Sequence, residues 1–476
     1  MIGITSYGAY IPLYRLNRAE IGRAWDIPAA PGEKAVANYD EDSLTMAVEA
    51  ARDCLKGINT GSIDGLFFAS TTAPYRDKQT AATIAMVLGI KRESVTMDFS
   101  GSLRCGTNAL RAAVDAVRSG SANNILVIAS EMRLGYPAGA NEISFGDGAA
   151  AVMVGNKAVI AEVEGSYSIY EELQDFWRSD KDLFVRSAED RFIVDEGYNK
   201  VIPTAVSGAL KTFGLTSKDF STCVLYVPNR RQAGTLVKKL GFDPKTQSKE
   251  TLFSNVGDTG SAMPMMSLVE ALEEAITGNR IMLVAYGNGC DVFSLKVTDA
   301  IEKAKVKNRM GITRSIASKK MLGNYNRYLR WRELVTIQPP ARPAIEYRQP
   351  GPQALWKENE KELRLRGTKC KNCGTPQYPP QRVCVNCRAK DNFEYYSFLD
   401  KKAKLFSFCH DHLMATIDPP VTVTVLDFEG GGRIIMDMTD RDPAECKVGM
   451  DIELTFRKLY YVGGIYNYWW KCRPAR

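Results

Sequence analysis

The sequence predicts a layered α/β fold followed by a smaller region rich in β-strands. Three observations support this prediction. β-prone runs alternate with helical patterns over roughly the first 300 residues, the order of these elements occurs twice, and two Cys-x-x-Cys pairs precede a series of short strands near the C-terminus. With 476 residues, the chain is long enough for two or three domains that each have a full hydrophobic core.

The composition favours a globular enzyme and excludes a membrane protein. Hydrophobic residues make up 45% and charged residues 25% of the chain, and no apolar run approaches the roughly 18 residues of a membrane span. Because the N-terminus also lacks a signal-peptide pattern, we expect a cytoplasmic location, where the 11 cysteines serve as thiols or metal ligands. The net charge of +7 is spread along the chain, with a concentration of basic residues at 303–332. No nucleic-acid recognition motif accompanies it, so nucleic acid is not an expected partner.

The first 335 residues are predicted to form two similar halves, residues 1–160 and 161–335, the second with a basic helical extension. In the first half, the expected elements are a strand at 65–70, a helix ending at 88–90, a strand-turn-helix at 95–114, a strand at 124–130 and a glycine turn leading into a strand at 145–154. In the second half, they are a strand at 223–228, a helix ending at 240–242, a glycine turn leading into a helix at 255–276, a strand at 280–285 and a glycine turn leading into a strand at 286–297. We infer that the turns at Cys105 and at 258–261 approach each other across a pseudo-twofold axis.

Cys105 is the first candidate nucleophile. β-prone residues 95–97, a turn at Gly101 and Ser102, and a helical pattern from Leu103 place Cys105 near a helix N-terminus. Free backbone N–H groups and the helix dipole lower the pKa of a thiol there, and Arg104 adds positive charge. A small buried cysteine packed under a helix is the alternative interpretation, and this segment alone leaves both open.

The C-terminal region is predicted to begin with a linker at 336–355, which is rich in proline, followed by a helix and a zinc ribbon at 356–398. Two Cys-x-x-Cys pairs supply four thiolates for a structural Zn²⁺ site without an open coordination position: Cys370, Cys373, Cys384 and Cys387. Residues 399–476 contain short strands separated by Gly and Pro turns, which predicts a five-stranded barrel of the OB type. The chain's two histidines, His410 and His412, share one face of a strand there, and an exposed strand face is favoured over a second metal site.

Several stretches of the first 335 residues resemble the thiolase superfamily, particularly the archaeal-type hydroxymethylglutaryl-CoA synthases. They are Gly8-Ala-Tyr-Ile-Pro12, Ala47-Val-Glu-Ala-Ala-Arg52, Asp175-Phe-Trp-Arg178, Leu240-Gly-Phe242 and Val297-Thr-Asp-Ala-Ile301. The resemblance implies a duplicated thiolase fold with αβαβα layers, a homodimer, acyl-CoA and CoA as ligands, and Cys105 as an acyl-accepting nucleophile.

The sequence departs from the synthases at three positions of the expected site. The synthases have a Glu where this chain has Thr71, a His where it has Asn229, and an Asn where it has Asp258. No histidine is available as a general base unless the C-terminal domain supplies one. We therefore expect hydroxymethylglutaryl-type condensation not to be the reaction.

The thiolase branch matches these positions better by resemblance. Thiolases have an oxyanion-binding Asn at the position of Asn229, a second catalytic cysteine at that of Cys290, and a His at that of Asp258. Asp258 is then an acid/base if burial raises its pKa, and Cys290 is a proton donor to the leaving enolate. Asp258 as a helix cap and Cys290 as loop filling remain alternatives, and Glu142 and Asp147 are weaker candidate bases.

The order of helix, zinc ribbon and barrel resembles the zinc-finger proteins that partner thiolases, here fused into one chain. The resemblance implies that this region helps to hold CoA or covers the acyl channel. The expected activity is therefore thiolase-type cleavage or formation of a 3-oxoacyl-CoA through an acyl thioester on Cys105. The alternatives are a condensation like that of the hydroxymethylglutaryl-CoA synthases, a thiolase-fold retro-aldolase, and a non-catalytic scaffold that binds acyl-CoA.

Overall fold

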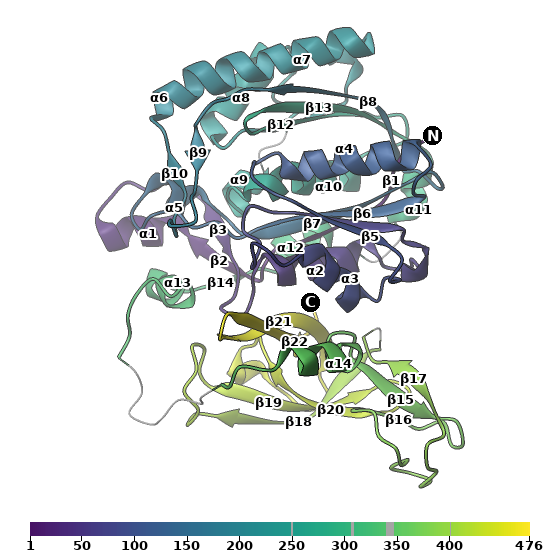
Figure 1. Cartoon of the computed structure of the whole chain (residues 1–476). Coiled ribbons are helices and arrows are strands. Elements are labelled where there is room, and N and C mark those ends of the chain that lie inside the picture. Colours follow the sequence, from purple (N-terminus) through teal and green to yellow (C-terminus); the bar gives the residue numbers. More distant parts are fainter. Residues whose placement is uncertain (249–250, 306–308, 339–346, 400) are drawn as a thin grey trace. The chain divides into compact units, whose positions relative to one another are not determined.

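The structure is a computed structural model that describes residues 1–248, 251–305, 309–338, 347–399 and 401–476 (Figure 1). It divides into two compact units. Unit 1 consists of Met1–Ala37, Asp42–Ala85 and Ile90–Tyr328, and unit 2 of Asn38–Glu41, Met86–Gly89 and Leu329–Arg476. Part of the predicted linker, residues 339–346, lies outside the described residues.

Unit 1 is built on a sheet of nine strands in the order β11-β12-β13-β8-β1-β7-β6-β4-β5. The strands are β1 (Gly3–Tyr10), β4 (Gly65–Ala69), β5 (Val95–Phe99), β6 (Asn124–Glu131), β7 (Gly148–Gly155), β8 (Ala161–Tyr170), β11 (Thr222–Tyr226), β12 (Arg280–Tyr286) and β13 (Gly289–Val297). Most of these strands are buried throughout, as expected for a sheet that is covered on both faces.

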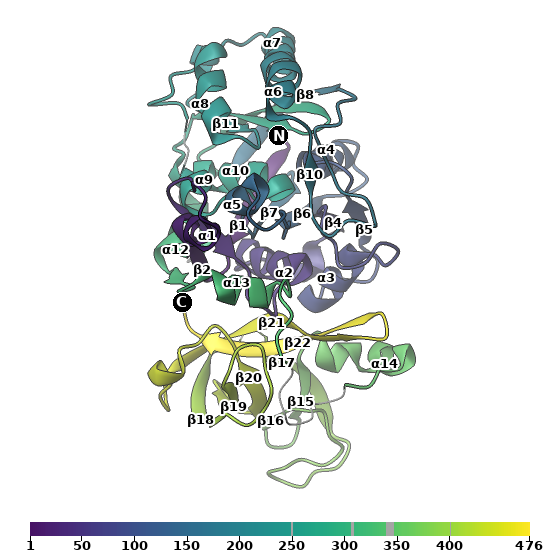
Figure 2. The ribbon, with the colours of Figure 1, turned by 90° about the vertical axis from the view of Figure 1, so that its left-hand side faces the viewer.

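Helices cover both sides of this sheet and also fill the space that it encloses (Figures 1 and 2). Helices α4 (Cys105–Arg118) and α10 (Met263–Glu274) share one hydrophobic core with inward-facing strand residues of both halves. Helices α2 (Ser43–Cys54) and α3 (Thr80–Leu88) lie on one outer side, and α7 (Asn199–Phe213) and α8 (Arg230–Lys239) on the other. The predicted αβαβα layering is confirmed.

The strand pairing confirms the predicted duplication. In the first half, β4 is parallel to β6, β6 is antiparallel to β7, and β7 is antiparallel to β1. In the second half, β11 is parallel to β12, β12 is antiparallel to β13, and β13 is antiparallel to β8. Each half thus repeats one pairing pattern. Helices α4 and α10 occupy matching places, because α4 directly precedes β6 and α10 directly precedes β12, the equivalent strand of the second half.

The remaining elements of unit 1 are short. They are β2 (Tyr14–Asn17), α1 (Arg18–Trp25), β3 (Glu33–Val36), η1 (Thr60–Ser62), α5 (Ala140–Ser144), β9 (Phe176–Trp177), β10 (Arg186–Ser187), α6 (Asp190–Phe192), η2 (Ile193–Tyr198), η3 (Ser217–Asp219), α9 (Thr251–Asn255), η4 (Gly260–Ala262), α11 (Ala300–Lys305), α12 (Gly311–Ala317), β14 (Lys320–Met321) and α13 (Tyr325–Trp331), whose last residues belong to unit 2. The predicted basic helical extension is thus divided into short helices, and β14 pairs with β2.

Unit 2 contains a helix, a ribbon and a closed barrel. Its elements are α14 (Pro352–Glu362), β15 (Arg366–Cys370), β16 (Pro376–Gln377), β17 (Phe393–Ser397), β18 (Ala403–Asp411), β19 (Val421–Phe428), β20 (Arg433–Met438), η5 (Pro443–Glu445), β21 (Asp451–Val462) and β22 (Ile465–Pro474). The barrel has the strand order β18-β19-β20-β22-β21, with β20 parallel to β22, so the predicted small barrel is confirmed. Its assignment to the OB type stays a prediction. No helix among the described residues is long and apolar enough to cross a membrane.

The four predicted zinc ligands gather at one end of the ribbon. Their sulfur atoms all lie within 4.8 Å of one another, with 3.6 Å between Cys370 and Cys387 and between Cys373 and Cys384. Tetrahedral zinc with Zn–S bonds of about 2.3 Å requires sulfur atoms about 3.8 Å apart, so the cluster fits Zn²⁺. Four protein ligands leave no open position, and the metal therefore stabilises the ribbon.

The second-metal interpretation of the histidines receives no support. The two ring nitrogens of His410 lie 2.9 Å from Thr422 Oγ1 and 3.2 Å from the Pro443 carbonyl. Within the part of the chain that the structure describes, the four-cysteine cluster is the one group of three or more potential ligands.

We predict that the purified protein contains one zinc ion per chain and that Cys384→Ser loses it. Structural zinc sites bind with about 10–16 kcal/mol of apparent free energy, which the folded ribbon then lacks. Elemental analysis by mass spectrometry and thermal unfolding measure the two effects. Cys409→Ser, which removes an exposed thiol outside the cluster, is the control and keeps its zinc. Full zinc content in Cys384→Ser would contradict the assignment.

Candidate active site

Cys105 lies where the sequence places it, at the first residue of α4 after the turn that follows β5. Ser102 Oγ in this turn donates a hydrogen bond to the Gly287 carbonyl, 2.9 Å away, which joins the turn to the last glycine loop of the second half. The Cys105 side chain is only 1% exposed. The predicted position at a helix N-terminus is confirmed.

The pKa of the thiol is shifted in the direction opposite to our expectation. Burial and the negative charge of Glu131 raise the pKa of Cys105 to about 12, although the helix N-terminal N–H groups and a hydrogen bond with Ser261 lower it. Desolvation of a thiolate therefore outweighs the helix terminus. Arg104 does not compensate, because its guanidinium is paired with Asp291 at 2.9 Å. Cys105 rests as a protonated thiol and needs a proton acceptor before it can act as a nucleophile.

Glu131, the last residue of β6, is a buried carboxylate that our sequence analysis missed. Its Oε1 accepts hydrogen bonds from the Thr71 backbone N–H at 2.7 Å and from Ser261 Oγ at 2.6 Å. Its Oε2 accepts from the hydroxyls of Thr71 and Thr72, at 3.1 and 2.9 Å. A Glu at the end of a mostly apolar strand was the available signal, since Glu is almost never buried without partners.

Ser261 lies in η4, directly before α10, and hydrogen-bonds to both Cys105 and Glu131. The N-terminus of α4 packs closely on this turn. A Cβ added to Gly106 would lie 2.7 Å from the Ser261 carbonyl oxygen, so only glycine allows the approach. The first half thus supplies Cys105 and Glu131, and the second half supplies the hydroxyl between them.

Asp258, our candidate acid/base, forms a buried ion pair. Its Oδ2 accepts from Arg133 Nη2 at 2.8 Å, and its Oδ1 accepts from the Tyr226 phenol at 3.0 Å and from the Gly260 backbone N–H at 2.8 Å. The hydrogen bond from the Gly260 backbone N–H is of the kind expected if Asp258 caps the following helix, which was the alternative role. Since three donors, one of them cationic, already hold this carboxylate, the arrangement favours a structural anion over a free base.

Arg133 is the second buried charged residue that the sequence analysis missed. Its guanidinium lies 4.0 Å from the centre of the Phe145 ring. On its other side is Gly260, which has a φ of +55° and where a Cβ would lie 2.6 Å from Arg133 Nε. Gly260 thus provides the space in which the guanidinium meets Asp258.

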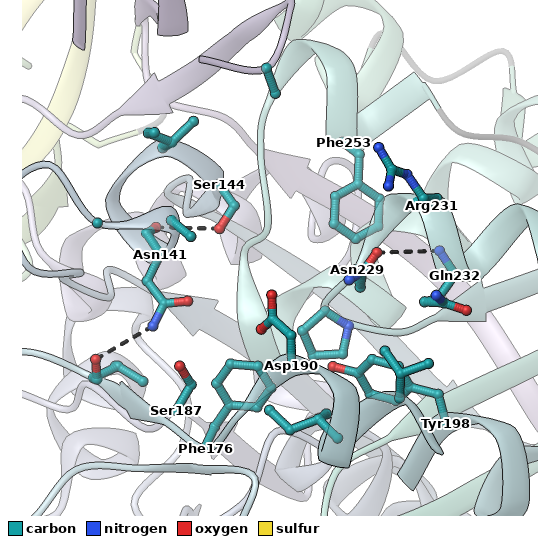
Figure 3. Close-up of a pocket in the computed structure, with 18 of the residues that line it drawn as sticks. Asn141, Ser144, Phe176, Ser187, Asp190, Tyr198, Asn229, Arg231, Gln232 and Phe253 are labelled. Atoms are coloured by element: carbon teal, nitrogen blue, oxygen red, sulfur yellow. Dashed lines mark hydrogen bonds between the residues drawn. The ribbon is translucent and has the colours of Figure 1, made fainter. Parts of the chain in front are cut away.

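Asn229 follows β11 and begins helix α8. Its side-chain oxygen accepts a hydrogen bond of 3.2 Å from the Gln232 backbone N–H, as drawn in Figure 3. Because this oxygen caps the helix, the amide nitrogen is the group left to donate to a ligand.

Cys290 is not brought to Cys105. Successive strand residues point to opposite faces. On β13, Asp291 faces α4, where it accepts from Thr107 Oγ1 at 2.7 Å. Cys290 faces the opposite side of the sheet and packs in the core formed with α7. This is the face of β13 turned away from the helix that carries Cys105.

The weaker candidate bases also have other partners. Glu142 accepts hydrogen bonds from the Tyr325 phenol and the Ala138 backbone N–H, both at 2.8 Å, and burial raises the pKa of its carboxyl. Asp147 accepts from the Ala37 backbone N–H at 2.7 Å. The described contacts of these two residues do not include Cys105.

A cavity of about 1080 Å³ opens in unit 1 (Figure 3). Its lining includes Asn229 together with aromatic and basic side chains: Tyr136, Phe176, Trp177, Tyr198, Phe253, Arg18, Arg186, Arg191 and Arg231. Cys105 is not part of the lining. Three lining residues connect the cavity to the Asp258–Arg133 pair. Ser144 precedes Phe145, which contacts Arg133, and Pro228 lies two residues after Tyr226, which donates to Asp258. Tyr198 lies within electrostatic reach of Asp258.

Comparison with known proteins identifies the chain's relatives. The hydroxymethylglutaryl-CoA synthase of Thermococcus gammatolerans is 36% identical over 311 residues, which cover 64% of this chain and 89% of the relative. That of Aeropyrum pernix is 35% identical over 314 residues, which cover 64% and 87%. The chain belongs to the hydroxymethylglutaryl-CoA synthase family. It is therefore a thiolase-superfamily enzyme, and the predicted superfamily is confirmed.

Solved structures and family models agree with this membership in fold. A crystal structure of hydroxymethylglutaryl-CoA synthase complexed with CoA matches with a TM-score of 0.62 at 18% identity, covering 74% of this chain and 95% of that chain. The 3-oxoacyl-[acyl-carrier-protein] synthase III of Aquifex aeolicus matches with a TM-score of 0.56 at 22% identity, covering 62% and 100%.

Two family models match parts of this member of the hydroxymethylglutaryl-CoA synthase family. Residues 80–168 match 3-oxoacyl-[acyl-carrier-protein (ACP)] synthase III, and residues 359–394 match the ChsH2 rubredoxin-like zinc ribbon domain. The relatives favour the condensation alternative of our sequence analysis over thiolase-type cleavage, in spite of Thr71 and Asn229.

We predict that Cys105 forms no thiolate between pH 6 and 9. A pKa raised to about 12 keeps the thiol protonated until the pH approaches that value. The thiolate absorbance near 240 nm, taken as the difference between the wild type and Cys105→Ser, measures this ionisation and cancels the other cysteines. A difference signal that is complete below pH 8 would show a low pKa and contradict the burial argument.

We predict that Arg133→Met lowers the free energy of unfolding by about 3–5 kcal/mol, because it leaves the Asp258 charge buried without its cationic partner. Urea unfolding measures this change, and adding Asp258→Asn recovers part of the loss. Arg111→Met, at the exposed pair with Asp115, is the control and costs less than about 1 kcal/mol. Equal effects of the two Arg substitutions would contradict the assignment of a buried ion pair.

Proposed function

We propose that this protein condenses acyl-CoA thioesters, and that Cys105 carries one acyl group while a carbon–carbon bond forms with a second acyl thioester. The observation that carries the proposal is the placement of the Cys105 thiol at the N-terminus of α4, with Ser261 and the Glu131 carboxylate beside it. Membership in the hydroxymethylglutaryl-CoA synthase family supports the reaction class.

The reaction has two halves. In the first, Cys105 Sγ attacks the thioester carbon of an acyl-CoA, the bond between sulfur and the acyl carbon forms, and the bond to the CoA sulfur breaks. In the second, a second acyl thioester loses an α-proton, and its carbanion attacks the acyl carbon held by Cys105. As the new carbon–carbon bond forms, the bond between that carbon and Cys105 Sγ breaks, and the sulfur takes up a proton again. Backbone N–H groups at the start of α4 and the Asn229 amide are the proposed donors to the negative oxygen atoms.

CoA thioesters are the proposed ligands of the cavity in unit 1. A related structure contains CoA, as its description states. The cavity volume of about 1080 Å³ is slightly above the usual range for small-molecule sites, which is about 300–1,000 Å³. Arginine side chains such as Arg191 and Arg231 suit phosphate groups, and the aromatic side chains suit a ring or an acyl chain. The proposed enzyme is a homodimer, as thiolase-type domains generally are.

The proton-transfer groups of the proposed condensation differ from those that the resemblance to the synthases implies. The chain has two histidines, His410 and His412, and both belong to unit 2. Thr71 stands where the synthases resembled by this sequence have a Glu, and it donates to Glu131 instead. The family reaction is therefore proposed without assigning the acyl groups.

We predict that mixing the protein with a panel of acyl-CoA thioesters adds the mass of an acyl group to the wild type and not to Cys105→Ser. Intact-protein mass spectrometry measures the adduct. Cys290→Ser, a buried thiol on the other sheet face, is the matched control and still forms it. Binding of CoA without any adduct would contradict the covalent mechanism and favour the retro-aldolase or the scaffold.

A further inference from the structure

We propose that Ser261 and Glu131 form a proton relay for Cys105, in which the thiol proton passes to Ser261 Oγ as the Ser261 proton passes to Glu131. The inference rests on the proposed acyl transfer and names the groups that make it possible. Glu131 is the proton acceptor and acts through Ser261, which touches the reacting sulfur.

The proposed relay supplies the proton acceptor that the buried Cys105 thiol requires. The burial that raises the pKa of Cys105 means that the attacking sulfur loses its proton during the attack rather than before it. Unit 1 contains no histidine. The nearby carboxylate of Asp258 is already paired with Arg133 and bonded to Tyr226. Among the described groups around Cys105, Glu131 is the carboxylate whose charge the thiol senses.

The geometry connects the three groups in series. Ser261 Oγ donates to Glu131 Oε1 over 2.6 Å, and the same hydroxyl hydrogen-bonds to the Cys105 sulfur. All three side chains are buried, so water does not compete for the path. After transfer, the hydrogen bond between Glu131 and Ser261 keeps its two oxygen atoms and reverses its direction. The donors on Oε2, the hydroxyls of Thr71 and Thr72, keep the carboxyl group in place throughout.

The atoms balance over the acyl transfer. Attack forms the bond between Cys105 Sγ and the acyl carbon, while the thiol proton moves to Ser261 Oγ and the original Ser261 proton moves to Glu131 Oε1. When the bond between the acyl carbon and the CoA sulfur breaks, the proton returns from Glu131 through Ser261 to the departing sulfur. CoA leaves as a thiol, and Glu131 is again an anion.

The test compares the rate of acyl-enzyme formation in four forms of the full chain, by rapid mixing and intact-protein mass spectrometry with an acyl-CoA that acylates the wild type. They are the wild type, Ser261→Ala, Glu131→Gln and the control Ser294→Ala. Ser294 is a buried serine that donates to the carboxylate of Glu164 at 2.7 Å, remote from Cys105 on β13, and so reproduces the same kind of hydrogen bond. Glu131→Gln retains the shape of the side chain and removes the proton acceptor together with the negative charge that raises the pKa of Cys105.

We expect Ser261→Ala and Glu131→Gln to slow acylation about 10²–10⁴-fold, the usual contribution of general acid–base catalysis. The pH profile separates this role from a structural one. Acylation of the wild type varies little between pH 6 and 9, because the acceptor is internal. In both relay variants the rate rises about tenfold per pH unit, since only preformed thiolate reacts. Ser294→Ala matches the wild type in both rate and profile.

Two outcomes would overturn the relay. Acylation of Ser261→Ala and Glu131→Gln with the wild-type rate and the wild-type pH profile would exclude it while leaving Cys105 as the acyl acceptor. Failure of the wild type itself to form an acyl adduct with the panel would instead contradict the proposed function. If Ser261→Ala does not fold, as judged by thermal unfolding, Glu131→Gln alone gives the decision.

Discussion

The burial of the Cys105 thiol beside the Glu131 carboxylate is the constraint on which the site depends. A thiolate without water and next to an anion is unfavourable, so the sulfur keeps its proton. The helix N-terminus and Ser261 reduce this effect but do not reverse it. A nucleophile under these conditions requires a proton acceptor within its own hydrogen-bond network, and Glu131 lies one hydroxyl away.

The duplicated fold is what assembles this network. Helices α4 and α10 pack against each other between the two halves of the sheet, so their N-terminal turns meet. The close approach of Gly106 to Ser261 fixes that meeting. The ion pair of Arg133 and Asp258 joins the same two halves just before η4, and Asp258 accepts a hydrogen bond from the Gly260 backbone N–H in the turn that presents Ser261. The duplication thus makes the site a product of both halves.

The sequence was sufficient for features that depend on local patterns. Alternating strands and helices, the turn before Cys105, the repeated element order and the spacing of Cys370 to Cys387 each carry their own signal. The partners of buried charged residues have no such signal in the local sequence. Thr71 stands where the synthases have a Glu, yet it donates hydrogen bonds to Glu131, which lies 60 residues further along the chain at the end of the neighbouring strand β6. The direction of the Cys105 pKa and the sheet face of Cys290 likewise depend on tertiary packing, which one-dimensional patterns do not contain.

The central claim is that this chain transfers acyl groups through Cys105. Isotope exchange between unlabelled acyl-CoA and deuterium-labelled CoA tests it most directly, because the exchange needs the first half-reaction and no second acyl substrate. We predict that the full chain moves label into acyl-CoA and that Cys105→Ser does not. Exchange at an equal rate in Cys105→Ser, or a condensed product formed without any exchange in the wild type, would contradict the claim.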